Sequence, residues 1–161
     1  MIYTDKTKKA MEIMFKQHKD QLDKSNTPYV FHPWHVAENQ EDEQRTIVAL
    51  LHDVVEDTDM TLEDIKNEGF DEETIEALKL LTHKDGEDYY EYVRRLSDNP
   101  IAVDVKLADL RHNSDLSRLN KVTEIDLQRV KKYKKCIDFL EMKKKMFNEN
   151  IEEETELRKA I

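Results

Sequence analysis

Residues 43–57, EQRTIVALLHDVVED, decide the fold. The stretch holds a nearly continuous apolar run, IVALL and then VV, and a helix of that composition is apolar on most sides, so it must be buried. The dipeptide His52–Asp53 lies in its middle. An isolated ionised carboxylate in such a place costs several kcal/mol unless it is paired or bound to a metal ion. Burial of this helix therefore demands a partner for Asp53.

The rest of the chain has the composition of an all-α protein with one core. Its 161 residues include only two glycines and three prolines, which favours long helices over tight turns. The length suits a single domain, which we place at residues 1–147, followed by an acidic C-terminal tail at 148–161. Helices are expected over residues 5–20, 43–57, 62–68, 71–82, 89–98 and 101–116, with a long amphipathic helix from Thr123.

Charge and composition exclude several classes of protein. The formal net charge of −10 argues against a general nucleic-acid binder, which needs a basic surface. Cys136 stands alone, so neither a disulfide nor a thiolate cluster can be built. No apolar run approaches the roughly 20 residues of a membrane-spanning helix, and the N-terminal residues lack the apolar stretch of a signal peptide. We expect a cytoplasmic protein that does not bind membranes.

Two further segments supply metal-ligating residue types to the same core. Asp109 lies in a second apolar stretch, VKLADL. His32 stands just before Pro33, which disfavours helical conformation at the preceding residue and so places the histidine at a helix entrance. Two imidazoles and two carboxylates without a thiolate suit Mn²⁺, Fe²⁺ or Zn²⁺ with open water positions, and such an ion can activate water. The predicted ligands are His32, His52, Asp53 and Asp109.

Helical spacing adds a second row of polar groups. Glu56 and Asp57 each follow one ligand of the central helix by four residues, so they project one turn beyond the ligands toward the same site. These acids are candidates to orient or deprotonate water. Asn113 follows Asp109 by four residues and is predicted to contact the substrate as a neutral hydrogen-bonding group.

Each of these signals has a plainer interpretation. A lone buried histidine is more often a satisfied core residue than a ligand, and lysine runs such as KKYKKC and MKKK are more often a solvated helix face than a binding patch. At the predicted site, by contrast, four residues of ligand type occur together with a second row of acids. This combination argues against a chance arrangement. The other histidines are therefore treated as non-ligands: His18, His35, His83 and His112.

The order His32, His52–Asp53, Asp109 resembles the H…HD…D pattern that names the HD phosphohydrolase superfamily. The flanking segments PYVFHPWHVA, ALLHDVVEDT and VKLADLRHN look like those of the hydrolase domain of RelA/SpoT alarmone enzymes, over about residues 20–120. That resemblance implies a helical HD-domain bundle in which one Mn²⁺ helps to remove pyrophosphate from the 3′ position of ppGpp or pppGpp. The chain resembles the small stand-alone hydrolases, so synthesis of alarmones is not expected.

The resemblance also implies roles for individual residues. It makes the four predicted ligands metal-binding, Glu56 and Asp57 catalytic, and Asn113 a nucleotide contact. In the family an Arg–Lys pair near the purine precedes the HP motif, and here Lys24 and Ser25 match while Asp23 stands at the arginine position. Lys24 and Ser25 are therefore predicted to bind substrate, and Asp23 departs from the family pattern at the residue next to the purine.

Two alternative functions remain open at the level of sequence. One is a nucleotidase or nucleotide phosphohydrolase of the wider HD superfamily, which would use the same metal ligands on another substrate. The other is a non-catalytic domain that binds a nucleotide or protein partner around a structural metal. The pair Glu56–Asp57 argues against the second, because two further acids near a structural metal add repulsion without a chemical role.

Overall fold

The computed structural model describes residues 1–160, with the side chains of residues 1–153 and Thr155. Within this range the chain is helical and forms no β-strand, and an isolated antiparallel bridge joins Leu22 to Pro28. The all-α prediction is confirmed. The helices are α1 (Asp5–His18), α2 (Phe31–Glu38), α3 (Glu43–Leu51), α4 (Val54–Asp57), α5 (Leu62–Asn67), α6 (Glu72–Leu81), α7 (Tyr89–Leu96), α8 (Pro100–Ser114) and α9 (Glu124–Ala160), with a 3₁₀ turn at Leu116–Arg118.

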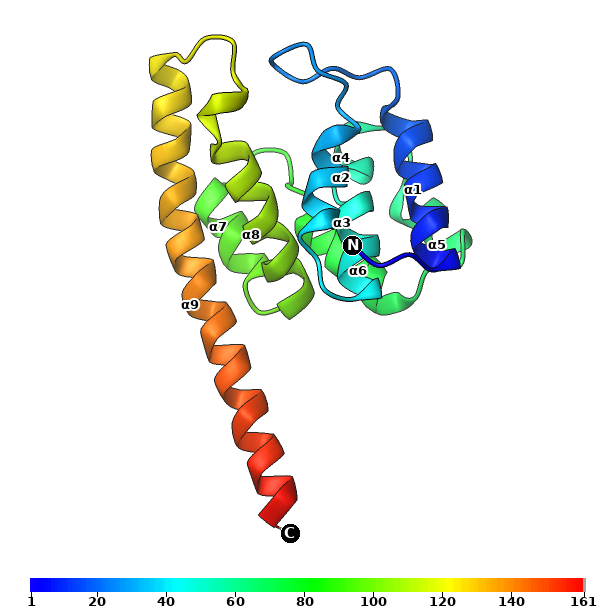
Figure 1. Cartoon of the computed structure of the whole chain (residues 1–161), viewed down its shortest axis with the longest axis vertical. Coiled ribbons are helices and arrows are strands. Elements are labelled where there is room, and N and C mark those ends of the chain that lie inside the picture. Colours follow the sequence, from blue (N-terminus) through cyan, green and yellow to red (C-terminus); the bar gives the residue numbers. More distant parts are fainter. Residues whose placement is uncertain (161) are drawn as a thin grey trace.

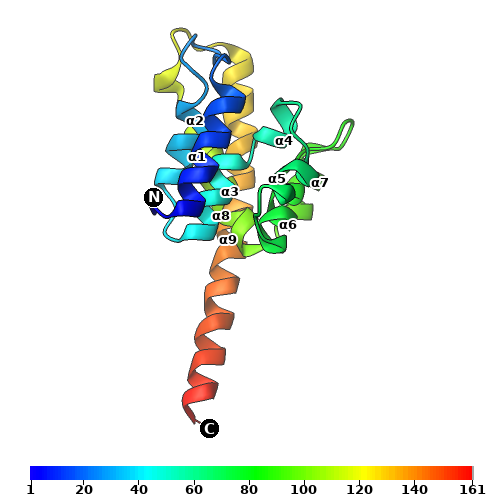
Figure 2. The same ribbon diagram turned by 90° about the vertical axis from the view of Figure 1, so that its right-hand side faces the viewer.

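Helix α3 is the centre of the bundle, as its apolar sequence predicts. It packs against α1, α2, α6 and α8, and every residue from Thr46 to Leu51 is buried. Figure 1 shows α1 on one side of it and α8 with α9 on the other, while Figure 2 shows α4 to α7 gathered beside this group. Because α2, α3 and α8 touch one another in pairs, residues from three distant segments meet in the core.

The central helix is interrupted where the sequence pattern predicted continuity. α3 ends at Leu51, and α4 begins at Val54. The cause is local: Nδ1 of His52 lies 2.7 Å from the carbonyl oxygen of Ala49, which would accept the Asp53 amide in an unbroken helix. His52 and Asp53 keep right-handed helical dihedrals at this interruption, and Nε2 of His52 lies 3.1 Å from Oδ2 of Asp53.

Helices α5 and α8 begin with clear capping groups. Asn99 caps α8 by accepting from the amide of Ala102 at 2.9 Å, and Pro100 fills the first helical position, where its missing N–H is not needed. Thr61 caps α5 in the same way through the amide of Asp64. α8 thereby starts at a fixed residue, and this sets which of its side chains face α2 and α3.

Helix α9 packs along α8 and then extends away from the body of the molecule (Figures 1 and 2). Cys136 and Leu140 are buried against the core in its first half. The helix runs through residue 147 and on to Ala160, so the predicted division at this point remains a prediction. None of the described helices combines the length and the apolar composition needed to span a membrane.

Candidate metal centre and adjoining pocket

Three of the predicted ligands form a buried cluster. His32 lies in the first turn of α2, His52 follows α3 and Asp109 lies in α8, and one ligand atom from each falls within 4.8 Å of the others. Nε2 of His32 is 3.2 Å from Oδ1 of Asp109, and Nε2 of His52 is 4.0 Å from the same oxygen. The structure thus brings together residues 20 to 77 positions apart in the chain.

Asp53 completes the group from one side. Its Oδ2 lies 3.1 Å from Nε2 of His52 and 3.5 Å from Nε2 of His32. The hydroxyl of Tyr29 donates to the same oxygen at 2.5 Å. Asp53 is less buried than Asp109, with 19% of its side chain exposed against 6%, so it faces the opening of the cluster.

The residues present fit a divalent cation. His52 donates from Nδ1 to Ala49, and its Nε2 is buried with no hydrogen-bond partner among the described residues. This nitrogen points at two carboxylates, and a cation between them would satisfy all three groups at once. Imidazole nitrogen with carboxylate oxygen is the donor set of Mn²⁺, Fe²⁺ or Zn²⁺, so the cluster is a possible metal site.

In the metal-free cluster the electrostatics favour ionised carboxylates and a protonated His52, whose proton a bound cation would displace. Burial alone would lower the pKa of His52, but the neighbouring Asp53 carboxylate raises that pKa to about 9. Burial alone would raise the pKa of both aspartates, yet His52 holds the pKa of Asp53 well below its usual range, and Lys106 does the same for Asp109. The two carboxylates therefore stay ionised, as metal ligands must be.

Lys106 adds a positive charge to the site. The sequence patterns did not identify this residue. Its Nζ lies 2.8 Å from Oδ2 of Asp109, and its side chain is only 12% exposed. The ammonium group also lies 5.0 Å from the ring centre of Tyr92. Burial would lower the pKa of Lys106, but Asp109 raises it well above its ordinary value, so Lys106 stays charged. Asp109 consequently keeps one oxygen for the cluster and one for the lysine.

Asn113 lies within the site, but its amide is turned toward a ligand. Its Nδ2 donates to Oδ1 of Asp109 at 2.5 Å, one helical turn away on α8. It also lines both cavities that adjoin the cluster. The predicted substrate contact is thus joined by an orienting role toward Asp109.

His112 is predicted to be a non-ligand, and it fixes the orientation of the predicted ligand His32. Its Nδ1 lies 2.6 Å from Nδ1 of His32 and 3.2 Å from Nη1 of Arg118. Arg118 can only donate, so Nδ1 of His112 accepts, and Nδ1 of His32 carries the proton between the two rings. The lone pair of His32 Nε2 is thereby directed at the aspartates. Burial and the nearby His32 and Arg118 lower the pKa of His112 to about 3, which keeps it an acceptor.

The two predicted catalytic acids lie on α4 at the opening of the cluster. Glu56 and Asp57 line a cavity of about 200 Å³ together with Asp53 and Asp109. One oxygen of Glu56 accepts from the backbone amide of His83 at 2.9 Å. Burial, followed by repulsion from Asp53 and Glu56, raises the pKa of Asp57. Two acids thus stand beside the predicted ligands, and the carboxyl group of Asp57 holds its proton more tightly than an ordinary aspartate.

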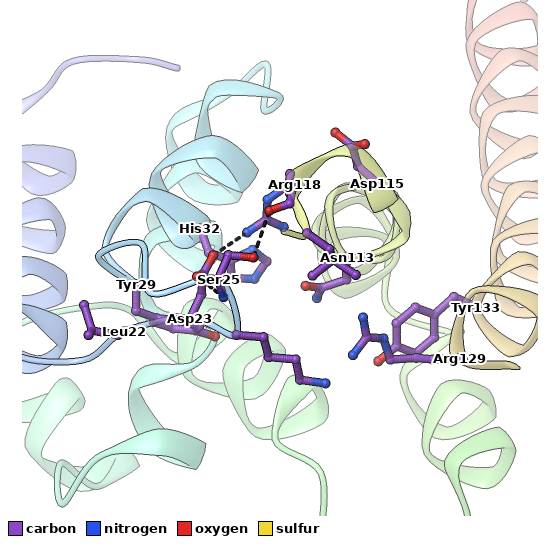
Figure 3. Close-up of a pocket in the computed structure, with 12 residues that line it drawn as sticks. Leu22, Asp23, Ser25, Tyr29, His32, Asn113, Asp115, Arg118, Arg129 and Tyr133 are labelled. Carbon is purple, nitrogen blue, oxygen red and sulfur yellow. Dashed lines mark hydrogen bonds and ion pairs between the residues drawn. The ribbon is translucent and has the colours of Figure 1, made fainter. Parts of the chain in front are cut away.

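A larger cavity of about 320 Å³ adjoins the cluster through His32 (Figure 3). Lys24, Ser25 and Asn113 all line it, so the three predicted substrate-binding residues share one pocket. The hydroxyl of Ser25, however, donates to the carbonyl oxygen of Arg118 at 2.8 Å and ties two loops together. The volume of this pocket is in the range of small-molecule binding sites, and the pocket lies next to the candidate metal centre.

Asp23 pairs with a distant arginine in this pocket. Its Oδ1 accepts from the backbone amides of Ser25 and Thr27, and its Oδ2 lies 3.2 Å from Nη2 of Arg118 (Figure 3). Burial would raise the pKa of Asp23, but these two amides and Arg118 lower it, so the carboxylate stays ionised. The position that departs from the family pattern thus holds a guanidinium group through an ion pair.

Comparison with known proteins agrees with the fold and the motifs. The sequence matches no protein-family model. It is 31% identical over 123 residues to the guanosine-3′,5′-bis(diphosphate) 3′-pyrophosphohydrolase of Aquifex aeolicus, which covers 69% of this chain and 18% of that protein. The protein of the same name from Borreliella burgdorferi is 42% identical over 78 residues, or 46% of this chain and 12% of the relative. The chain spans less than a fifth of these curated relatives.

A solved structure matches over almost its whole length. It is that of a metazoan ortholog of SpoT described as hydrolysing ppGpp, with a TM-score of 0.71 and 25% sequence identity over 91% of this chain and 95% of the other. This chain is a homologue of the SpoT/RelA ppGpp hydrolases. The resemblance read from the sequence motifs is confirmed, and so is the HD-domain fold that it implied.

Three polar residues of this SpoT/RelA homologue were missed from its sequence: Lys106, His112 and Arg118. The first two had a signal, because they stand three positions before and after Asp109 and so share its face of α8. Arg118 had none, since it meets Asp23 across 95 residues through a 3₁₀ turn. Local periodicity cannot reveal such a contact.

Proposed function

We propose that this chain is a metal-dependent phosphohydrolase that removes pyrophosphate from the 3′ position of guanosine 3′,5′-bis(diphosphate). The observation that carries the proposal is the buried cluster in which Nε2 of His32 and Nε2 of His52 face two ionised carboxylates, beside a cavity that two further acids line. The similarity to hydrolases of that name supports the choice of substrate. The catalytic unit is proposed to be residues 1–147, because every residue of the site lies within it.

The proposed metal ligands are His32, His52, Asp53 and Asp109, and the ion is proposed to be Mn²⁺, which suits nitrogen and oxygen donors without thiolate. Bound there, the ion supplies an activated water and neutralises charge on the phosphate. His112 and Ala49 hold the two imidazoles by their Nδ1 atoms, so both Nε2 atoms face inward. Lys106 and Asn113 hold Asp109 in the same manner.

The chemistry of the chain itself is proton transfer and positioning. Water attacks the phosphorus atom joined to the 3′ oxygen, and the bond between that phosphorus and the 3′ oxygen breaks. In the proposed reaction one of the two carboxyl groups of Glu56 and Asp57, which line the cavity beside the ligands, accepts the proton of the water, and the other donates a proton to the leaving 3′ oxygen. Lys24 lines the adjoining cavity and attracts the highly charged substrate against the acidic net charge of the protein.

A substrate panel tests this function. Protein supplied with Mn²⁺ is incubated with ppGpp, pppGpp, deoxynucleoside triphosphates and 5′-nucleotides, and the products are separated by ion-exchange chromatography. Pyrophosphate and GDP from ppGpp are expected, without turnover of the other classes. Turnover of a deoxynucleotide or 5′-nucleotide with ppGpp left intact would instead assign the site to another HD-superfamily reaction.

A further inference from the structure

One end of the larger cavity is built by two loops fastened together. The hydroxyl of Ser25 donates to the carbonyl oxygen of Arg118 at 2.8 Å, and Nδ2 of Asn120 donates to the carbonyl oxygen of Ser25 at 3.3 Å. The ion pair between Asp23 and Arg118 joins the same loops. Three contacts across about 95 residues of chain make this end of the cavity a preformed surface.

The guanidinium group of Arg118 is fixed in this surface by its edge. Nη2 faces Oδ2 of Asp23 at 3.2 Å, while Nη1 donates to the carbonyl oxygen of His112 at 3.1 Å and lies 3.2 Å from the Nδ1 of its ring. Both terminal nitrogens thus have protein partners, and the carboxylate offsets the positive charge. A phosphate group needs the donors and the net charge of an arginine, and here both are largely engaged. The Arg118 side chain is 28% exposed and lines the cavity, so the flat faces of the guanidinium are the part left to interact with a ligand.

Apolar side chains share the cavity with that flat cation. Leu22 and Leu119 both line it, and Leu22 is 60% exposed although it is a large hydrophobic residue. A planar cation beside apolar walls suits an aromatic ring, because guanidinium groups stack on π-systems and leucines contribute by removal of apolar surface from water. Nucleobases are the aromatic rings of the proposed substrate class.

We propose that Arg118, held by Asp23 and flanked by Leu22 and Leu119, is the nucleobase-binding residue of this site. The inference rests on the proposed function, since it seats the base of a nucleotide whose 3′ phosphates lie at the metal cluster. Arg118 binds the base by stacking, and Asp23 is a positioning residue that keeps the guanidinium plane in place. Recognition of the base is thereby assigned to a residue of the 3₁₀ turn.

The test separates stacking from phosphate binding with two inhibitors of ppGpp hydrolysis. Guanosine carries the base without phosphate, and pyrophosphate carries the charge without the base. Arg118→Lys keeps the charge and removes the plane, and it is expected to raise the inhibition constant of guanosine and the KM for ppGpp about 10-fold, within the range for one stacked base, at nearly constant kcat. Lysine, like arginine, can only donate to Nδ1 of His112, so the inhibition constant of pyrophosphate and the amount of bound metal, measured by elemental analysis, should not change.

Two further variants complete the design. Arg111→Lys is the matched control, because Arg111 lies exposed on α8 and pairs with Glu141 outside the cavity, and it should leave every constant unchanged. Asp23→Asn keeps the loop's hydrogen-bonding oxygen but releases the ion pair, so it should raise the guanosine constant with Arg118 intact. Circular dichroism establishes that each variant is folded.

Each outcome decides between the inference and its alternatives. An unchanged guanosine constant in folded Arg118→Lys refutes the nucleobase role, and a raised pyrophosphate constant with unchanged guanosine assigns Arg118 to phosphate instead. If the wild-type protein does not hydrolyse ppGpp, the proposed function fails. In that case calorimetry of guanosine binding to the wild type and to Arg118→Lys still tests the base site, and equal affinity would refute it.

Discussion

Replacement of Lys106 by methionine should expose how the buried charges balance. Nζ of Lys106 lies 2.8 Å from Oδ2 of Asp109, and the two side chains are 12% and 6% exposed. Methionine fills similar volume but leaves the carboxylate beside Asp53 without its lysine. Breaking a buried ion pair by removing one partner costs about 3–5 kcal/mol. For a protein of this size each kcal/mol shifts Tm by about 2–4 °C, so the metal-free variant should melt at least about 6 °C lower.

The assay is thermal unfolding followed by circular dichroism, with a chelator and again with saturating Mn²⁺. Because bound Mn²⁺ neutralises the same carboxylates, it should reduce the difference in Tm between Lys106→Met and the wild type. Lys79→Met is the control, since the Lys79–Glu76 pair is exposed and should contribute at most about 1 kcal/mol. If the Tm of metal-free Lys106→Met falls no further than the Tm of the control, the argument that Lys106 compensates a buried charge is refuted.

Four other outcomes follow from the site. Glu56→Gln and Asp57→Asn should keep stoichiometric metal by elemental analysis yet lose roughly 10²–10⁴ in turnover, whereas exposed Glu63→Gln should match wild type; unchanged turnover would remove these acids from the reaction. In metal-free protein the pKa of His52 is raised from 6.5 to about 9, so its ion pair stabilises the fold fully below about pH 6.5 and is lost as pH rises through about 9. Urea unfolding across pH 6–10 would measure that decline, and a rising stability would contradict the sign. Chelation should abolish phosphohydrolase activity, and Mn²⁺ should restore it; activity that survives complete stripping excludes a catalytic metal. Truncation after Phe147 should retain turnover, because the site residues precede it, and loss of turnover in a folded truncation would move the domain boundary.

The buried helices could be predicted from sequence because their residues carry the information locally. The run IVALL makes α3 apolar on most sides, and α3 is the central helix. The interruption after Leu51 could not be read from that pattern, since it depends on a side-chain contact of His52 with the Ala49 carbonyl. Hydrophobic periodicity reports which face is buried and says little about a hydrogen bond that ends a helix.

Some residues of the candidate site could be predicted from the sequence, and others could not. His52, Asp53 and Asp109 were predicted because polar residues in apolar segments demand partners, and the structure brings them together with His32. The groups that orient them were not predicted, because the contact of His112 with His32 joins two helices 80 residues apart. Residue types reveal the atoms that need a partner, while only the packing of α2 on α8 reveals which partner they find.

The most direct test of the central claim is a titration of Mn²⁺ into metal-stripped protein with ppGpp as substrate, in which pyrophosphate release is recorded against bound metal. The proposed site predicts no release without metal, a rise that saturates at one ion per chain, and no rise in the Asp109→Ala variant. Pyrophosphate release that is independent of bound metal, or equal in the Asp109→Ala variant, would contradict a catalytic centre built on His32, His52, Asp53 and Asp109.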